Sequence, residues 1–365
     1  MGAAAFLMAE LTGIPYVVIA VSAIVPAVLY FMGIFFAVHF EAKKLGLKGL
    51  PKEMLPSLGG LLIRKGYLFL PILVLIGFMG IGFTPAYSAC FAILAAFIVS
   101  FFKKETRISP TGLVETLTNG SRSTIGVAIA CAVAGTIIGI VSLTGIAQTL
   151  IGALIAIVNN PFFLKTGISL FAALFVTMIS CLILGMGVPT TANYVIMATI
   201  TAPMVMRTGA ELGIAIPVLA AHLFVFYFGI VADITPPVAL AAYAGAAIAK
   251  SDPIKTGITA TRLAITAFIV PYVFIFNPAM LFIDASGFRI VQAVLSTSIG
   301  MFGIAVGIAG YMVRKVTIPW RIAAVVGGLL LIHQSIQTDI AGFGIITLFT
   351  VVQIIQWKRG KSQAS

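Results

Sequence analysis

Long apolar runs without charged residues constrain this chain more than any other feature of its sequence. Residues 14–38 and 263–283 are two such runs, and each is long enough to cross a bilayer as a helix of roughly 20 residues. Backbone groups in hydrocarbon must bond within their own segment, and the residue alternation of an outer-membrane barrel is absent. The composition agrees, because 61% of the residues are hydrophobic and only 9% are charged. The sequence therefore predicts an all-α polytopic membrane protein.

The charges between the apolar runs predict how the chain is oriented. Basic residues gather at 41–66, 103–122, 250–262, 314–321 and the C-terminal tail, and such loops are typically cytoplasmic. The nearly uncharged loops at 10–15, 159–166, 284–289 and 337–340 would be external. The net charge of +12 therefore sets orientation and is not a nucleic-acid signal. Plain crossings are expected at about residues 15–40, 67–83, 86–102, 124–147, 262–284, 290–313, 320–336 and 341–357.

The remaining stretch, residues 167–250, cannot be a plain pair of crossings. It must begin outside and end inside, and Gly/Pro-rich breaks interrupt it at 185–191 and 233–237. One arrangement satisfies both constraints: a re-entrant hairpin over 167–207 with its tip at 186–191, and one crossing over 212–250 that is unwound near 232–237. The whole chain would then have about nine crossings plus one hairpin.

Paired breaks of this kind predict a transport site. Two Gly/Pro-interrupted apolar segments are typical of secondary transporters, in which half-helix N–H groups face an anionic substrate and unwound carbonyls bind Na⁺. The alternative is that both breaks are proline kinks that only aid helix packing. Weak internal symmetry favours a transporter, because residues 2–6 resemble 239–243 and the two stretches run in opposite senses, as in inverted repeats.

Three motifs carry a resemblance to a known family. They are Gly-Ile-Gly-Phe-Thr-Pro-Ala-Tyr-Ser-Ala at 80–89, Leu-Gly-Met-Gly-Val-Pro-Thr-Thr at 184–191, and Gly-Ile-Val-Ala-Asp-Ile-Thr-Pro-Pro-Val at 229–238. In this order they resemble the DctM-like large membrane subunit of the tripartite ATP-independent periplasmic (TRAP) transporters, and most of all the fused permeases of the TAXI subgroup. The resemblance covers roughly residues 1–285.

The resemblance implies a function and a set of partners. Its members take up organic acids with Na⁺ by an elevator mechanism in the cytoplasmic (inner) membrane. A periplasmic or extracellular solute-binding protein delivers the substrate, and a small membrane subunit assists. No cofactor besides the coupling ion is implied, and no enzyme activity. Neither a His-Glu-x-x-His motif nor a facing pair of intramembrane aspartates is present, which argues separately against an intramembrane protease.

By resemblance, the hairpin tip and the unwound helix would together form one Na⁺ site and half of the substrate site. The implied substrate residues are Gly187, Pro189, Thr190, Thr191, Asn193, Thr235, Pro236 and Pro237. The implied Na⁺ residues are Gly185, Gly187, Thr190, Ala232, Asp233 and Thr235.

The resemblance also divides the chain into segments. Residues 1–13 would be the remnant of a first-repeat broken helix, 14–123 linking and scaffold helices, 124–285 the second inverted repeat, and 286–365 a three-helix C-terminal extension. The first repeat would then be N-terminally truncated. The alternative function is a non-transporting fragment or assembly subunit that needs a separate chain for the missing half.

Several single residues keep two interpretations. Asp233 would support the Na⁺ site or merely cap a helix. His222 would couple protons or, more simply, pack as a hydrogen-bonded neutral side chain. Arg207 is the nearest, though weak, candidate for binding a substrate carboxylate. The spacings Gly135-x-x-x-Gly139 and Gly303-x-x-x-Gly307 favour close helix packing.

Overall fold

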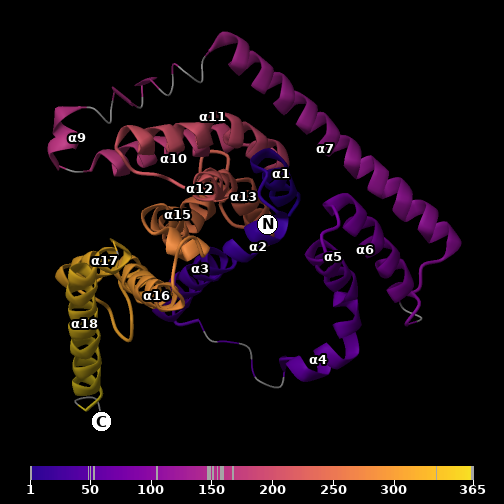
Figure 1. The fold of residues 1–365 in the computed structure, drawn as a ribbon. Coiled ribbons are helices and arrows are strands. Elements are labelled where there is room, and N and C mark those ends of the chain that lie inside the picture. The colour runs from indigo at the N-terminus through magenta and orange to yellow at the C-terminus, as the bar shows by residue number, and fades with distance from the viewer. Residues whose placement is uncertain are drawn as a thin grey trace. The chain divides into compact units, whose positions relative to one another are not determined.

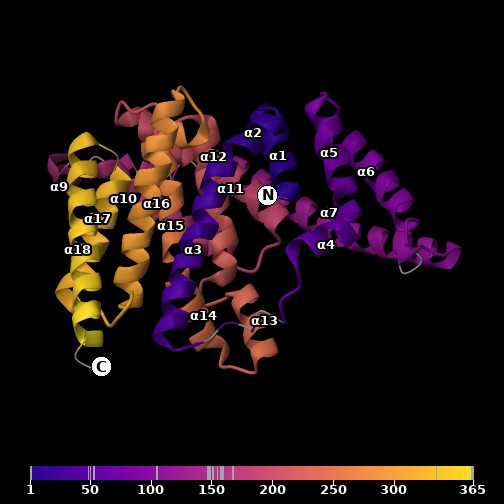
Figure 2. The same ribbon diagram turned by 90° about the horizontal axis from the view of Figure 1, so that it is seen from below.

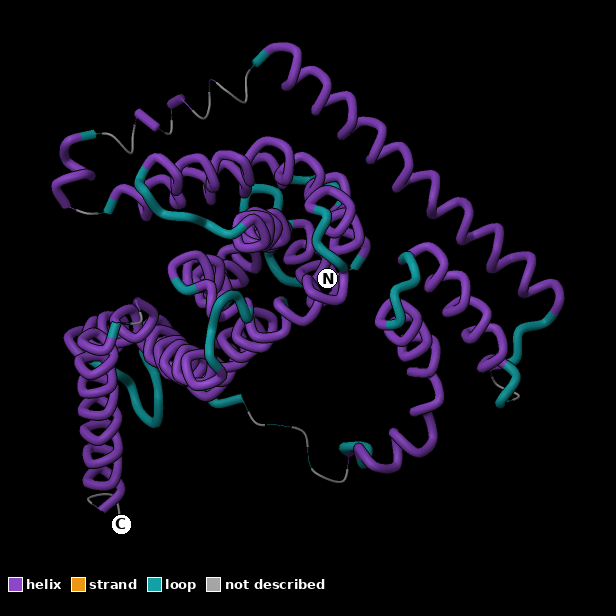
Figure 3. The backbone as a smooth tube through the Cα atoms, in the orientation of Figure 1, coloured by secondary structure: helices purple, strands orange, loops and turns teal. Residues whose placement is uncertain are grey.

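A computed structural model describes an almost wholly helical chain (Figures 1 and 3). It describes residues 2–47, 49, 51, 54–103, 106–145, 149, 152–153, 155–156, 160–166, 168–333 and 335–362. Met1 and Gly167, the first residues of the predicted segments 1–13 and 167–207, lie outside the described residues. The chain forms two compact units: Met1–Ile19 with Gly49–Ala132, and Ala20–Lys48 with Val133–Ser365.

The first unit contains short apolar helices, and a capping side chain is found at the start of α6 (Pro85–Ser100). In the motif at 80–89, the Thr84 hydroxyl accepts a hydrogen bond from the Tyr87 N–H at 3.5 Å, and Pro85 occupies the first helical position. The two helices on either side pack through Phe78 and Phe91, whose rings stack 4.2 Å apart. This unit holds α1 (Ala3–Thr12), α4 (Leu58–Lys65), a 3-10 turn (Gly66–Phe69), α5 (Leu70–Gly80) and α6 (Pro85–Ser100).

Two helices, α2 (Tyr16–Ser22) and α7 (Pro110–Thr144), are shared between the units. The second unit holds α3 (Ile24–Lys44), α9 (Pro161–Thr166), α10 (Ser169–Gly185), α11 (Thr190–Glu211), α12 (Val218–Val231), α13 (Leu240–Ala249), α14 (Pro253–Leu263), α15 (Ile265–Phe276), α16 (Gly287–Ala309), α17 (Ile318–His333) and α18 (Ile336–Ser362).

Helix α12 is the core of the second unit. It is apolar all round, which is typical of a buried helix, and it contacts α10, α11 and α15. Leu223, Phe224 and Phe228 are fully buried on it. The Tyr272 ring on α15 lies edge-to-face against Phe224 and Phe228, at centroid distances of 5.4 and 5.8 Å. The second break, which follows α12 directly, therefore borders a tightly packed centre.

Helices α16, α17 and α18 pack side by side, and α3 lies against α16 (Figure 2). A Cβ added to Gly303 would lie 2.8 Å from the Ala324 carbonyl oxygen, and one added to Gly307 would lie 2.9 Å from that of Arg321. The close packing predicted from the Gly303-x-x-x-Gly307 spacing is therefore confirmed. For Gly135 and Gly139 the same packing stays a prediction, since within the described residues a Cβ at either position would meet no atom within 4 Å.

The prediction of a polytopic membrane protein is supported by helix length and by exposed apolar surface. Within the described residues, the stretches long and apolar enough to span a bilayer are Tyr16–Lys44, Leu58–Gly80, Pro253–Phe276, Gly287–Ala309 and Ile336–Arg359. Shorter apolar helices lie between them. On α3, Phe31 and Phe35 are 69% and 64% exposed, as side chains that face lipid would be. The number of crossings stays a prediction.

Two expected segments differ from the structure. The basic segment at 103–122 is helical from Pro110 onward, because Ser109 caps the new helix by accepting the Gly112 N–H at 3.0 Å, and proline is tolerated in a first turn. The apolar run at 262–284 leaves its α-helix at Phe276, because Pro278 lacks an N–H and Asn277 caps the following 3-10 turn.

Candidate functional site

The first break is a tight tip between α10 and α11, which lie in contact. Residues 186–189 connect them, and Gly187 has a φ of +72°, which favours glycine. Pro189 has extended backbone and is followed at once by Thr190, the first residue of α11. Deeper in the hairpin, the Cys181 thiol donates to the Thr201 hydroxyl at 3.4 Å.

The second break separates α12 from α13. A 3-10 turn over Ala232–Ile234 ends α12, and the Thr235 hydroxyl donates back to the Val231 carbonyl at 2.8 Å. Pro236 and Pro237, joined by a cis peptide bond, carry no N–H, so the helical hydrogen bonds stop there. α13 then begins after Ala239, whose φ is +36°.

Side chains from neighbouring helices hold the carbonyls that the second break exposes. The Thr261 hydroxyl on α14 donates to the Ile234 carbonyl at 3.0 Å. The Tyr243 hydroxyl on α13 donates to the Pro237 carbonyl at 2.7 Å. The Ile234 and Pro237 carbonyls of the unwound backbone therefore each accept a side-chain hydrogen bond, which stabilises this conformation.

The two breaks lie against each other. Asn193, in the first turns of α11, donates from Nδ2 to the Gly229 carbonyl at the end of α12 over 2.9 Å. A Cβ added to Gly185 would lie 3.0 Å from the Ala232 Cβ, and one added to Gly187 would lie 3.8 Å from the Val238 Cγ1. Segments 36 to 51 residues apart in sequence thus form one junction.

Asn193 leaves one oxygen free inside this junction. The residue is only 3% exposed, and its Oδ1 accepts no hydrogen bond from the described part of the chain. A buried polar atom without a partner is unfavourable by about 1–3 kcal/mol, so such an atom points to a ligand. Amide and carbonyl oxygens are the ligands that hard cations prefer.

Asp233 lies at the start of the second break and is half-buried. Its carboxylate makes no hydrogen bond or ion pair with any residue that the structure describes. The helix-capping interpretation of Asp233 therefore finds no support in the structure, and a negative charge stands beside the unwound carbonyls.

The predicted residues separate into a buried layer and an exposed rim. Gly185, Asn193 and Ala232 are buried where the breaks touch. Thr191, Asp233, Thr235 and Pro236 are half-buried, and the exposed residues are Gly187, Pro189, Thr190 and Pro237. Gly229, Tyr243 and Thr261 also contribute to the junction, although they were not among the predicted site residues. Gly229 is the first residue of the motif at 229–238, whereas Thr261 reaches the Ile234 carbonyl only through tertiary packing.

The structure does not bring His222 or Arg207 into the junction of the two breaks. The Tyr194 hydroxyl and the His222 Nδ1 lie 2.8 Å apart and are buried, which fits a hydrogen-bonded packing histidine. Arg207 is exposed near the far end of α11, roughly 25 Å along the helix from Thr190, so it does not reach the tip.

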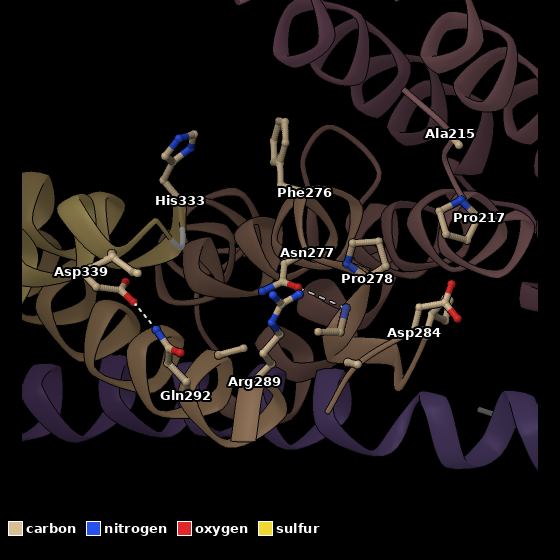
Figure 4. A pocket seen from close by; sticks show the side chains of 15 residues that line it. Ala215, Pro217, Phe276, Asn277, Pro278, Asp284, Arg289, Gln292, His333 and Asp339 are labelled. Atoms are coloured by element: carbon tan, nitrogen blue, oxygen red, sulfur yellow. Dashed lines mark hydrogen bonds between the residues drawn. The ribbon is translucent and has the colours of Figure 1, made fainter. Parts of the chain in front are cut away.

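A separate polar pocket of about 590 Å³ lies between the C-terminal ends of α15 and α17 and the N-terminal ends of α16 and α18 (Figure 4). Gln292 Nε2 donates to Asp339 Oδ2 at 3.1 Å, and the Arg289 side chain lies beside Asn277. None of the predicted site residues lines this pocket. The loops around it were expected to be nearly uncharged, yet Asp284, Arg289 and Asp339 gather there.

The donor types in the junction suit an alkali cation. No group of three or more His, Cys, Asp or Glu side chains occurs within the residues that the structure describes. A transition-metal centre of that kind is therefore not found there, and the junction offers amide, hydroxyl and carboxylate oxygen instead.

Comparison with known proteins identifies the family. A family model described as "Tripartite ATP-independent periplasmic transporter, DctM component" matches residues 1–287, which include both breaks. No curated protein and no solved structure matches the chain. The family is a membrane transport component and not an enzyme family. The chain therefore belongs to the DctM-component family of the tripartite ATP-independent periplasmic transporters.

Proposed function

We propose that this permease component carries an organic acid across the cytoplasmic membrane together with Na⁺, and that the junction of the two breaks binds both. One observation carries the proposal. Asn193 joins the hairpin to α12 through Nδ2 while its buried Oδ1 stays free. A cation at this oxygen would draw the two breaks together, so cation binding would be coupled to the conformation of the site.

The exposed rim is the proposed place for the substrate. α11 has 22 residues and begins at Thr190, so the positive end of its dipole and its unpaired N–H groups favour an anion there. Thr190, Thr191 and Thr235 add hydroxyl groups beside it. A carboxylate on this rim would lie close to the cation, which lowers the cost of bringing the anion into the membrane.

The charges at the helix ends support the proposed orientation. Lys43, Lys44, Arg262, Lys315 and Lys358 all follow or end helices of the second unit, and Figure 2 shows the ends of α3 and α18 on the same side as α14. By the positive-inside rule this side would be cytoplasmic, and because α18 ends there, the C-terminal tail is expected on the same side. The polar pocket would then be external.

The proposed partners follow from the family. TRAP permeases generally work with a periplasmic solute-binding protein and a small membrane subunit. For this chain we expect both, with the binding protein delivering substrate to the external side. The helices beyond the family match, α16–α18, fit the fused permeases of the TAXI subgroup, and an elevator movement of the hairpin and α12 would carry the site across.

Uptake into proteoliposomes tests this function. The chain, reconstituted with its small subunit and binding protein, should accumulate one of a panel of radiolabelled organic acids under an inward Na⁺ gradient but not under a K⁺ gradient. The double variant Asp233→Ala with Thr235→Ala should lower the initial rate at least about tenfold.

The matched control is Glu115→Ala with Thr118→Ala, an exposed acidic/threonine pair on α7, which is not one of the helices that meet at the junction. It should retain most of the uptake. Equal uptake by the wild type and the Asp233/Thr235 variant, in a sample where Na⁺ drives transport, would contradict the proposed site.

A further inference from the structure

A groove with basic residues at its mouth lies at the opposite end of α16 from the polar pocket. It has a volume of about 500 Å³ and lies between the end of α14, the end of α16 and the start of α17. Its charged lining residues are Arg262 and Arg321, and its exposed apolar lining is Ile318, Ile322 and Val326. The groove thus combines two cations with an apolar surface.

Arg321 is fixed in place by backbone carbonyls. Its Nε donates to the Gly307 carbonyl at 2.8 Å and its Nη2 to the Ile308 carbonyl at 3.1 Å, at the C-terminal end of α16. A guanidinium carries five N–H donors, so most of its hydrogen-bonding capacity remains. Within the described chain Arg321 forms no ion pair with a carboxylate, and its hydrogen-bond partners are these two carbonyls.

Arg262 is only partly neutralised. Its Nη2 lies 2.7 Å from Glu41 Oε1, and Lys44 Nζ lies 3.4 Å from Glu41 Oε2. One carboxylate therefore faces two cations, which leaves a positive charge on this side of the groove. The Arg262 side chain is 44% exposed, so its remaining N–H groups are accessible to a ligand.

The apolar side of the groove belongs to α17. Ile318 and Ile322 are 69% and 59% exposed, one helical turn apart, and Val326 follows one turn further along. These side chains run away from Arg321 along the helix. A ligand that fits this surface has an anionic head beside the guanidiniums and an apolar chain beside the valine and isoleucines.

We propose that this groove binds an anionic phospholipid, with its phosphate on Arg262 and Arg321 and an acyl chain along α17. Arginine forks match phosphate geometry, and basic pockets between membrane helices at the cytoplasmic side are suited to anionic head groups. The positive excess favours a lipid with net negative charge over a zwitterionic one. Arg262 lies within residues 1–287 and Arg321 beyond them, so the lipid would fasten α17 to the family-matched part of the chain.

Native mass spectrometry of the full chain in detergent tests the proposal, with phosphatidylglycerol and phosphatidylcholine of equal acyl chains as probes. Phosphatidylglycerol should bind about tenfold more tightly, as expected for basic residues that add favourable charge at a head group. The double variant Arg262→Gln with Arg321→Gln should lose this preference. The matched control Arg289→Gln, at the other end of α16, should keep it.

Because Arg321 also caps α16, the double variant could be unstable, so a second variant probes the apolar half. Ile322 is largely exposed, so Ile322→Trp should fold normally while filling the groove, and it should weaken phosphatidylglycerol binding at least about threefold. Equal binding of the two lipids would overturn the proposal, as would wild-type phosphatidylglycerol binding by Ile322→Trp. Displacement of the lipid by equimolar inorganic phosphate would also overturn it, since a phosphate site without lipid would then suffice.

Discussion

At the residue scale, the site depends on how closely the two breaks approach. Gly185 and Gly229 both face Asn193, and a Cβ on either would come within 3.1 Å of its side-chain atoms. Glycine at both positions leaves room for the Asn193 amide to reach the α12 carbonyl, whereas a Cβ would press against it. The junction therefore needs small residues on both sides and one amide between them.

Substitution of Gly185 tests this contact. In Gly185→Ala the new Cβ would lie 3.0 Å from the Ala232 Cβ and 3.2 Å from the Gly229 carbonyl oxygen, so the tip must move. We expect a loss of about 1–3 kcal/mol in unfolding free energy, as for other overpacked sites, and a lower melting temperature in detergent.

Gly245→Ala is the matched control, because Gly245 lies in α13 with no atom within 4 Å of a new Cβ. It should be neutral or gain about 0.5–1 kcal/mol, the usual helical preference for alanine over glycine. Equal melting temperatures for the two variants would contradict the close contact of Gly185 with Gly229 and Ala232.

The sequence revealed part of this residue-level arrangement. Gly185, Asn193 and Asp233 could be named because they lie in Gly/Pro-rich breaks inside apolar stretches, where polar residues are costly. Thr261 could not, because it lies on an ordinary helix and reaches Ile234 only through tertiary packing. Local pattern predicts where a helix breaks, but the donors that satisfy the freed carbonyls come from elsewhere in the chain.

At the element scale, glycine spacing decides how α16 and α17 pack. The two helices approach so closely that a Cβ on Gly328 would lie 2.5 Å from the Gly300 carbonyl oxygen and 2.8 Å from an Ile304 side-chain carbon. Small residues permit this approach in lipid, where there is no hydrophobic force between helices. The Gly303-x-x-x-Gly307 spacing was sufficient to predict this close approach. The start of α7 could not be predicted in the same way, because the basic residues at 103–122 indicated a loop and the helix begins there through a hydrogen bond to Ser109.

Gly328→Ala should therefore separate α16 from α17. A backbone carbonyl at 2.5 Å cannot rotate away, so we expect a loss of about 1–3 kcal/mol and a lower melting temperature. Gly344→Ala, on α18 with open space around the new Cβ, should melt at or above the wild-type temperature. If Gly328→Ala melts as the wild type does, the described packing of α16 and α17 is incorrect.

At the scale of the whole molecule, orientation and family follow from different features. The charge alternation of the loops predicts which helix ends are cytoplasmic, whereas the family match identifies a transport component. The number of crossings could not be fixed from the sequence, because several apolar helices, such as α17 (Ile318–His333), are shorter than a typical span. A segment shorter than the hydrocarbon layer can still cross when the bilayer thins locally or flanking side chains reach the interface.

Cysteine labelling tests the orientation. A thiol introduced at Lys315, in the turn between α16 and α17, should react with a membrane-impermeant maleimide in inverted vesicles only. A thiol introduced at Ser286, just before α16, should react in right-side-out vesicles only. The same vesicles with the unmodified chain give the background from its native cysteines, and the reverse pattern would overturn the orientation.

Equilibrium binding of radioactive Na⁺ to the purified chain tests directly whether the two breaks together form a cation site. The measurement requires no known substrate. The wild type should bind Na⁺ saturably, K⁺ should not compete, and Asn193→Ala and the Asp233→Ala, Thr235→Ala double variant should each weaken binding at least about tenfold. The Glu115→Ala, Thr118→Ala control on α7 should bind as the wild type does. Unchanged Na⁺ affinity in both junction variants would contradict the account.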